Sequence, residues 1–242
     1  MGGHHRISND SLDAFREILE LHRVERCALR KAQSQASSDW LSAWVELVYC
    51  ILASTQIRSE EAGRALLYLV SNLNGLIQYS VIARKPTVCE RQISERLTKT
   101  GYRFPNSKSS SIVSAACFFV RLVRESGRPT DMDLFETRRR MVSTVYGIGP
   151  KTSSLWFRNL GFDIPVIDIH VRRILACSDL LDSRQVATHI DGNEYERIEN
   201  TVMNLAQNIG VTSSDLDCAL WEHGKGYCTR SACPICPFGG DS

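Results

Sequence analysis

Apolar residues recur at helical spacing along nearly the whole chain, whereas the strict alternation of a half-buried strand is almost absent. The stretch from Trp40 to Leu52 is apolar nearly all round and follows two good helix caps, Ser38 and Asp39, so it predicts a buried central helix. With 43% hydrophobic and 23% charged residues, the 242-residue chain can form one large domain or two small ones. We therefore expect an all-α fold.

The most informative stretch runs from Val145 to Thr152 and joins two expected helices. Gly147 and Gly149 permit a tight turn, and Pro150 suits the first position of the second helix. The pattern predicts a helix-hairpin-helix. Free N–H groups at the start of the second helix would form a phosphate site, which makes Gly147, Gly149 and Thr152 candidate phosphate-binding residues. A plain connector between two core helices is the alternative.

Two charged residues near this hairpin are candidates for catalysis. Lys151 falls in the first turn of the second helix, where the macrodipole and partial burial would disfavour a charged amine and make it available as a nucleophile. A solvated or phosphate-pairing lysine is the alternative. Asp168 follows an apolar approach and precedes another expected helix, so it is a strong N-cap candidate. A capping carboxylate at the mouth of a cleft could also orient an amine or stabilise a developing cation.

Nine cysteines, an odd number, argue against a disulfide framework and for core thiols, a metal site or both. Five are scattered, and four fall within the last 25 residues: Cys218, Cys228, Cys233 and Cys236. No stretch is apolar and long enough to span a membrane, and the first thirty residues lack the apolar run of a signal peptide. The sequence thus predicts a cytoplasmic protein that is not secreted. A net charge of +2 neither requires nor excludes a nucleic-acid partner.

These features together resemble the helix-hairpin-helix DNA glycosylases, which include endonuclease III, the adenine glycosylase of mismatch repair and the 8-oxoguanine DNA glycosylases. The hairpin, Lys151 and Asp168 match that family's signature of a Gly-hydrophobic-Gly hairpin, a lysine and a downstream Asp. Residues 46–56 resemble the family's buried helix, which ends in Gln. Three further segments are most similar to the small archaeal and bacterial class of 8-oxoguanine glycosylases: 101–104 with Lys108, 153–161 and 216–221.

The resemblance implies a base excision repair enzyme, a bifunctional DNA glycosylase and AP lyase acting on double-stranded DNA that contains a damaged base. Lys151 would attack C1′, displace the base and form a Schiff base before elimination nicks the strand, while Asp168 would help deprotonate the amine. Gln56 would fill the gap in the base stack, and Trp221 would stack on the flipped base. For these two, a polar residue at a helix end and plain core packing are the alternatives. The segments named above favour 8-oxoguanine as the excised base.

The tail departs from that small class and resembles the iron-sulfur loop of endonuclease III. The family spacing is C-x6-C-x2-C-x5-C, whereas Cys228, Cys233 and Cys236 give C-x4-C-x2-C, and Ser242 stands where the last cysteine would fall. Cys218 would then supply the fourth thiolate of a [4Fe–4S] cluster. Zinc, or a cluster that lacks one cysteine ligand, is the alternative.

We therefore expect a two-lobed helix-hairpin-helix DNA glycosylase fold with a C-terminal cysteine-rich metal loop. Residues 31–130 would form the central helical lobe, residues 1–30 and 131–224 the lobe that contains the hairpin, and residues 225–242 the metal loop. We expect a monomer associated with the nucleoid. Two rival functions remain: an endonuclease III-like glycosylase for oxidised pyrimidines or other modified bases, and a non-catalytic DNA-binding module, since a hairpin alone grips phosphates without reading sequence.

Overall fold

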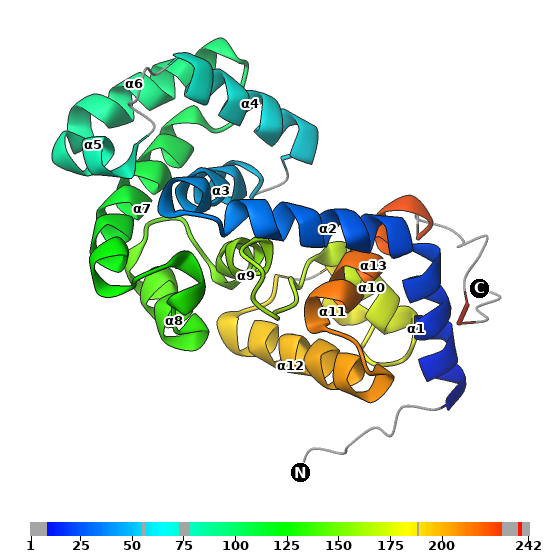
Figure 1. Cartoon of the computed structure of the whole chain (residues 1–242). Helices are drawn as coiled ribbons and strands as arrows, with labels where there is room; N and C mark the ends of the chain where they lie inside the picture. Colours follow the sequence, from blue (N-terminus) through cyan, green and yellow to red (C-terminus); the bar gives the residue numbers. More distant parts are fainter. Residues whose placement is uncertain (1–8, 55–56, 73–77, 188, 229–236, 239–242) are drawn as a thin grey trace. The chain divides into compact units, whose positions relative to one another are not determined.

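The computed structural model describes residues 9–54, 57–72, 78–187, 189–228 and 237–238. These residues form helices joined by loops and contain no strand, so the all-α prediction is confirmed for this part of the chain (Figure 1). None of the described helices is long and apolar enough to cross a membrane. The chain divides into two compact units: unit 1 is residues 1–32 with 163–242, and unit 2 is residues 33–162.

Unit 2 is built around the helix α3, which is the predicted central helix. The helices of the unit are α3 (Trp40–Leu52), α4 (Ser59–Asn72), α5 (Tyr79–Arg84), α6 (Pro86–Lys99), α7 (Pro105–Glu125), a short 3-10 helix (Pro129–Asp131), α8 (Leu134–Thr144) and α9 (Pro150–Asn159). Asp39 caps α3 as predicted, because its side chain accepts the N–H of Ser42 at 2.8 Å. Trp44 of α3 is fully buried, and its ring meets Phe119 of α7 with centroids 5.3 Å apart.

The hairpin helices belong to unit 2, which differs from the lobe division expected from the sequence. That division grouped residues 131–162 with the N-terminal helix, whereas in the structure they pack with the central helices. The physical reason is the burial of Trp156 on α9. Its indole Nε1 donates to the carbonyl oxygen of Ala43 on α3 at 2.9 Å, and its ring lies 6.1 Å from Phe119. α9 is therefore fixed to the central helix.

Unit 1 has its own apolar core. Its helices are α1 (Asn9–Leu21), the part of α2 (Arg23–Ala36) up to residue 32, α10 (Ile169–Cys177), α11 (Arg184–Ala187), α12 (Gly192–Ile209) and α13 (Ser213–Gly226). α1, α10 and α12 all pack against α13 (Figure 1). The buried Asp215 near the start of α13 binds both Arg26 and Arg30, with Arg30 Nε donating to its Oδ1 at 3.2 Å. These ion pairs fasten the beginning of α2 to α13.

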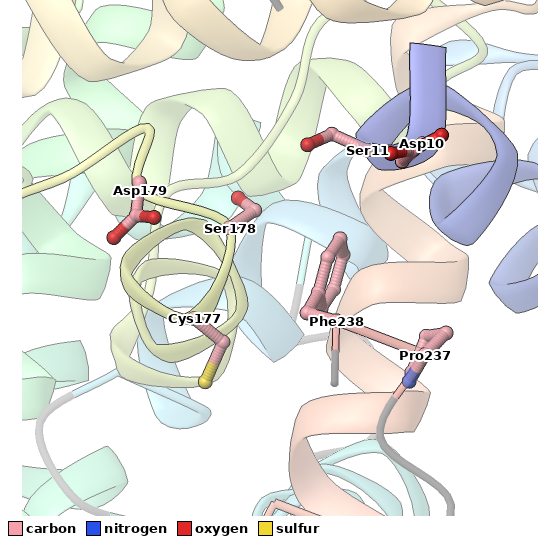
Figure 2. A pocket seen from close by; sticks show the side chains of 7 residues that line it. All are labelled: Asp10, Ser11, Cys177, Ser178, Asp179, Pro237 and Phe238. Carbon is pink, nitrogen blue, oxygen red and sulfur yellow. The ribbon is translucent and has the colours of Figure 1, made fainter. Parts of the chain in front are cut away.

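The last described residues of the chain also pack on unit 1. The Phe238 ring meets Phe15 of α1 edge-on, with centroids 4.9 Å apart, at the margin of the core. Phe238 lines a surface pocket of about 290 Å³. Figure 2 shows its side chain beside residues from the start of α1 and the end of α10. Its lining residues are Asp10, Ser11, Cys177, Ser178, Asp179, Pro237 and Phe238. The far end of the cysteine tail is thus anchored to the core of unit 1.

Candidate active site

The predicted hairpin forms between α8, which ends at Thr144, and α9, which begins at Pro150. Gly147 has φ of +74°, a left-handed conformation that side chains disfavour, and a Cβ there would collide with Oγ of Ser111 on α7. The turn is also tied to α7 by a hydrogen bond from the N–H of Tyr146 to Oγ of Ser114 at 3.0 Å. The backbone conformation and the close approach to Ser111 require glycine at position 147, and the hairpin is fixed on its own unit.

The start of α9 leaves backbone donors available. Gly149 is the cap residue and provides no side-chain hydrogen bond, while Pro150 occupies the first helical position. The N–H groups of Lys151 and Thr152 belong to the first turn, so they have no acceptor within the helix. Thr152 is buried, whereas Lys151 is exposed. This end of α9 therefore presents N–H groups and one ammonium group, an arrangement suited to phosphate.

The exposure of Lys151 corrects one expectation. We expected partial burial of the amine, and this was wrong because the side chain lies on the solvent side of α9. The neighbouring residues Thr152, Ser153 and Ser154 take up the buried side of the same turn. An exposed amine is accessible to a ligand that arrives from solution. The nucleophilic role of Lys151 remains a prediction.

Asp168 is the N-cap of α10, as predicted. Its Oδ1 accepts the N–H groups of His170 at 2.8 Å and Val171 at 3.1 Å, and only 8% of the residue is exposed. The preceding residue is fixed as well, because the N–H of Ile167 donates to the hydroxyl of Tyr195 at 3.0 Å. Both capping bonds use Oδ1, so Oδ2 is the oxygen that could serve a ligand. The carboxylate is held rigidly at the end of a helix.

A second charged group lies near this carboxylate. Burial lowers the pKa of the Arg172 guanidinium, and the negative charge of Asp168 opposes that shift. Lys151 belongs to unit 2 and Asp168 to unit 1.

Trp221 packs as the alternative interpretation expected, but part of its side chain stays exposed. It is partly exposed on α13 and packs against the core of unit 1. Nζ of Lys225 lies 4.4 Å from its ring centroid in a cation–π contact, and the ring of His170 meets it edge-on at 6.2 Å. A base that stacked on the face beside Lys225 would have to displace that ammonium group. The stacking role of Trp221 remains a prediction.

Gln56 lies outside the described residues, but the end of α3 ahead of it is well defined. The hydroxyl of Tyr102 donates to the carbonyl oxygen of Leu52, and Nζ of Lys108 donates to Oγ of Ser54. Lys108 is only 4% exposed, and this burial lowers the pKa of its ammonium group. In the sequence, Tyr102 and Lys108 belong to a segment that is similar to the small class of 8-oxoguanine glycosylases, but the sequence assigned neither residue a role. The structure shows that they hold the carboxyl end of the central helix.

The cysteine site is described only in part. Cys233 and Cys236 lie outside the described residues, whereas Cys218 and Cys228 are buried in unit 1. Among the described residues, no group of three His, Cys, Asp or Glu side chains is assembled for a metal. Cys218 lies on α13 (Ser213–Gly226), and Cys228 follows shortly after the end of that helix. The identity of the metal centre remains a prediction.

Comparison with known sequences identifies the family of this chain. Residues 28–211 match the Ogg-HhH family, described as 8-oxoguanine DNA glycosylase. The chain belongs to the 8-oxoguanine DNA glycosylase family. The matched range includes the central helix, the hairpin, Lys151 and Asp168, so membership confirms the resemblance drawn from those residues. The match ends ahead of Trp221 and the cysteine tail, and it bears on neither.

Curated relatives from archaea cover most of the chain. The 8-oxoguanine DNA glycosylase/AP lyase of Metallosphaera sedula is 32% identical over 210 residues, which cover 86% of this chain and 92% of that relative. The 8-oxoguanine DNA glycosylase/AP lyase of Sulfurisphaera tokodaii is 29% identical over 210 residues, which cover 84% of this chain and 93% of that relative. The family likeness therefore extends over nearly the full length of these enzymes.

Solved structures of the family share the fold. The 8-oxoguanine DNA glycosylase of Thermotoga maritima gives a TM-score of 0.71 at 19% identity, covering 91% of this chain and 100% of that one. The 8-oxoguanine glycosylase/lyase of Methanocaldococcus jannaschii, in complex with a 15mer DNA containing 8-oxoguanine, gives 0.70 at 21% identity, covering 90% and 99%. At these identities the likeness establishes the helix-hairpin-helix glycosylase fold.

Proposed function

We propose that this protein is a bifunctional DNA glycosylase and AP lyase that excises 8-oxoguanine from double-stranded DNA through a lysine Schiff base. The observation that carries the proposal is an exposed lysine at the start of the second hairpin helix, in a chain of the 8-oxoguanine DNA glycosylase family. Curated relatives named 8-oxoguanine DNA glycosylase/AP lyase support it, as does the related enzyme solved with 8-oxoguanine DNA. The enzyme would act on DNA at the nucleoid, in the cytoplasm.

Lys151 performs the chemical step in this proposal. Its neutral amine attacks C1′ of the damaged nucleotide, and the bond between C1′ and the base breaks, so that the base leaves with the electron pair and takes up a proton. Opening of the sugar ring then gives a Schiff base between Nζ and C1′. The Schiff base acidifies C2′, which loses a proton to a base or to water; a double bond forms between C2′ and C3′, and the 3′ phosphate leaves with the electron pair of the C3′–O bond, which nicks the strand. The exposed position of Lys151 in the first turn of α9 gives its amine access to the flipped nucleotide.

Asp168 assists in two ways. Its Oδ1 is occupied by two backbone N–H groups, which hold the carboxylate in one orientation. The remaining oxygen, Oδ2, accepts the proton that the attacking amine loses and stabilises positive charge on the sugar. A carboxylate held by two hydrogen bonds needs no reorganisation when charge develops, so its effect on the barrier is larger than that of a mobile side chain.

The remaining candidates bind and distort the DNA. The hairpin binds DNA phosphates through the backbone at Gly147 and Gly149 and through the N–H of Thr152. These contacts do not recognise the base sequence. Gln56 fills the space left in the base stack, and Trp221 stacks on the extruded base. These assignments follow from the resemblance and from the helix end described above.

We also propose that the tail binds a metal centre through Cys218, Cys228, Cys233 and Cys236, with a [4Fe–4S] cluster favoured over zinc. The resemblance of the tail to the iron-sulfur loop of endonuclease III, with these cysteines grouped near the end of the sequence, supports the iron-sulfur cluster. Such a cluster would shape a DNA-binding surface. Purified protein should be yellow-brown and contain iron and sulfide, and a colourless protein with one equivalent of zinc would contradict the cluster but leave the glycosylase proposal intact.

The decisive experiment replaces Lys151 with Gln. The variant should lose both release of 8-oxoguanine and the borohydride-trapped covalent complex, while its affinity for the duplex changes little, since hairpin contacts to phosphate come from the backbone. Lys31→Gln, at an exposed lysine on α2, is the matched control and should behave as the natural protein. Undiminished strand cleavage by Lys151→Gln would refute the mechanism. A panel with thymine glycol, dihydrouracil and abasic sites would reveal a preference for oxidised pyrimidines.

A further inference from the structure

Helices α10 and α13 are in close contact at Gly224. A Cβ built on this glycine would lie 2.7 Å from the carbonyl oxygen of His170 and 3.0 Å from its carbonyl carbon and Cβ. Two of these three atoms are backbone, so they cannot swing away as the end of a flexible side chain does. Any residue other than glycine at position 224 would therefore push α13 and the first turn of α10 apart.

The backbone that Gly224 touches also holds the candidate catalytic carboxylate. The N–H of His170 donates to Oδ1 of Asp168 at 2.8 Å, and Asp168 is the residue directly ahead of α10. One turn earlier on α13, the ring of Trp221 meets the ring of His170 edge-on. His170 therefore takes part in both interactions: its backbone carbonyl contacts α13 at Gly224, and its N–H holds the Asp168 carboxylate.

We propose that Gly224 is a positioning residue for the glycosylase reaction, because it sets the separation of α10 from α13 and thereby the place of the Asp168 carboxylate. This inference rests on the proposed role of Asp168. Gly224 itself touches neither the DNA nor the reacting atoms in this account. It acts through the backbone of His170.

The size of the effect follows from the geometry. An ordinary contact of a Cβ begins near 3.4 Å, so alanine at position 224 requires a displacement of about 0.7 Å from the 2.7 Å separation. The Asp168 carboxylate moves with the first turn of α10, because it is hydrogen-bonded to two N–H groups of that turn. Misplacement of a reacting group by about 1 Å lowers a rate by about 100-fold. We expect Gly224→Ala to slow base release by about 10- to 100-fold.

The test compares Gly224→Ala with Gly226→Ala in the full chain. Gly226 lies two residues further along the same helix, and a Cβ there meets nothing within 4 Å. Release of 8-oxoguanine is measured under single-turnover conditions, together with the dissociation constant for the lesion duplex and the thermal midpoint. Gly224→Ala should lose rate but keep its duplex affinity within about twofold, since phosphate contacts come from the hairpin. Gly226→Ala should match the natural protein in all three.

A double-mutant cycle with Asp168→Asn decides whether Gly224 acts through the carboxylate. If it does, Gly224→Ala should slow the Asp168→Asn protein little further, whereas independent effects would multiply. Multiplying effects would overturn the inference, and so would a Gly224→Ala protein with natural rate or one that does not fold, since the glycine would then serve the fold alone. If Asp168→Asn alone keeps the natural rate, the proposed role of Asp168 fails. If Asp168→Asn is slow and Gly224→Ala is not, only this inference fails.

Discussion

The two roles of Asp168, helix capping and catalysis, can be separated by two substitutions. Asn keeps an oxygen that accepts the N–H groups of His170 and Val171, whereas Ala removes it and leaves both donors of a buried helix start without that partner. Loss of an N-cap costs about 0.5–2 kcal/mol. In a chain of this size, each kcal/mol lowers Tm by about 2–4 °C. Asp168→Ala should therefore lower Tm by about 1–8 °C, and Asp168→Asn by much less.

The two variants should nevertheless lose activity to a similar extent. Both lack the negative charge, and removal of one fixed electrostatic group from an active site lowers a rate by about 100- to 1,000-fold. The measurements are the single-turnover rate of 8-oxoguanine release and the thermal midpoint by circular dichroism. The expected pattern is a pair of slow enzymes, of which only Asp168→Ala is clearly less stable.

A second cap in the same unit provides the control. Asp191 caps α12, where its side chain accepts the N–H of Glu194 at 2.8 Å. Asp191→Ala should lower Tm by a similar amount with no change in base release. If Asp168→Asn releases base at the natural rate, and Asp168→Ala is slower only in proportion to its loss of stability, then Asp168 is a cap and the catalytic argument is refuted.

Three further outcomes are expected. Phe238→Ala should lower the stability of unit 1 by about 1–3 kcal/mol, less than a fully buried Phe, and an unchanged Tm would show that the contact with Phe15 is not formed in solution. Gly147→Ala should weaken duplex binding, because φ of +74° and the collision with Ser111 both distort the hairpin, whereas an unaltered affinity would contradict this. Burial lowers the pKa of His22, against the attraction of Glu25 and Glu222, while the neighbouring His223 is also buried. Because the unfolded histidine takes up its proton first, Tm should fall as the pH drops below about 6.5, and His22→Phe should reduce this dependence in a thermal melt series.

Local patterns were sufficient for the central helix and for the hairpin. The cap at Asp39 and the apolar run after it are local signals, and α3 begins and ends close to them. The same holds for α10, whose start depends on the side chain of Asp168 and the two N–H groups that follow it. Such signals involve residues within one helical turn of each other, so the helix starts that depend on them can be predicted from the sequence.

Contacts between distant residues could not be predicted in this way. No periodicity pairs Gly224 with the backbone of His170, or Lys108 with the hydroxyl of Ser54, because each pair depends on how two helices pack. The exposure of Lys151 was missed for the same reason, since the orientation of α9 is set by the burial of Trp156. The sequence motif identified Lys151 as a candidate, and tertiary packing determined its surroundings.

The chain order of the two units has a consequence for the folding of the protein during its synthesis. Unit 2 is one continuous segment, residues 33–162, so it can form its core as soon as that segment has left the ribosome. Unit 1 combines residues 1–32 with residues 163–242, and Phe15 and Ile18 of α1 have their core partners on α10, α12 and α13. The apolar face of α1 therefore stays exposed to solvent and to chaperones until at least about 150 further residues have been made, because α1 ends at Leu21 and α10 begins at Ile169. A nascent chain stalled before α10 would carry a folded unit 2 and an unburied, aggregation-prone α1.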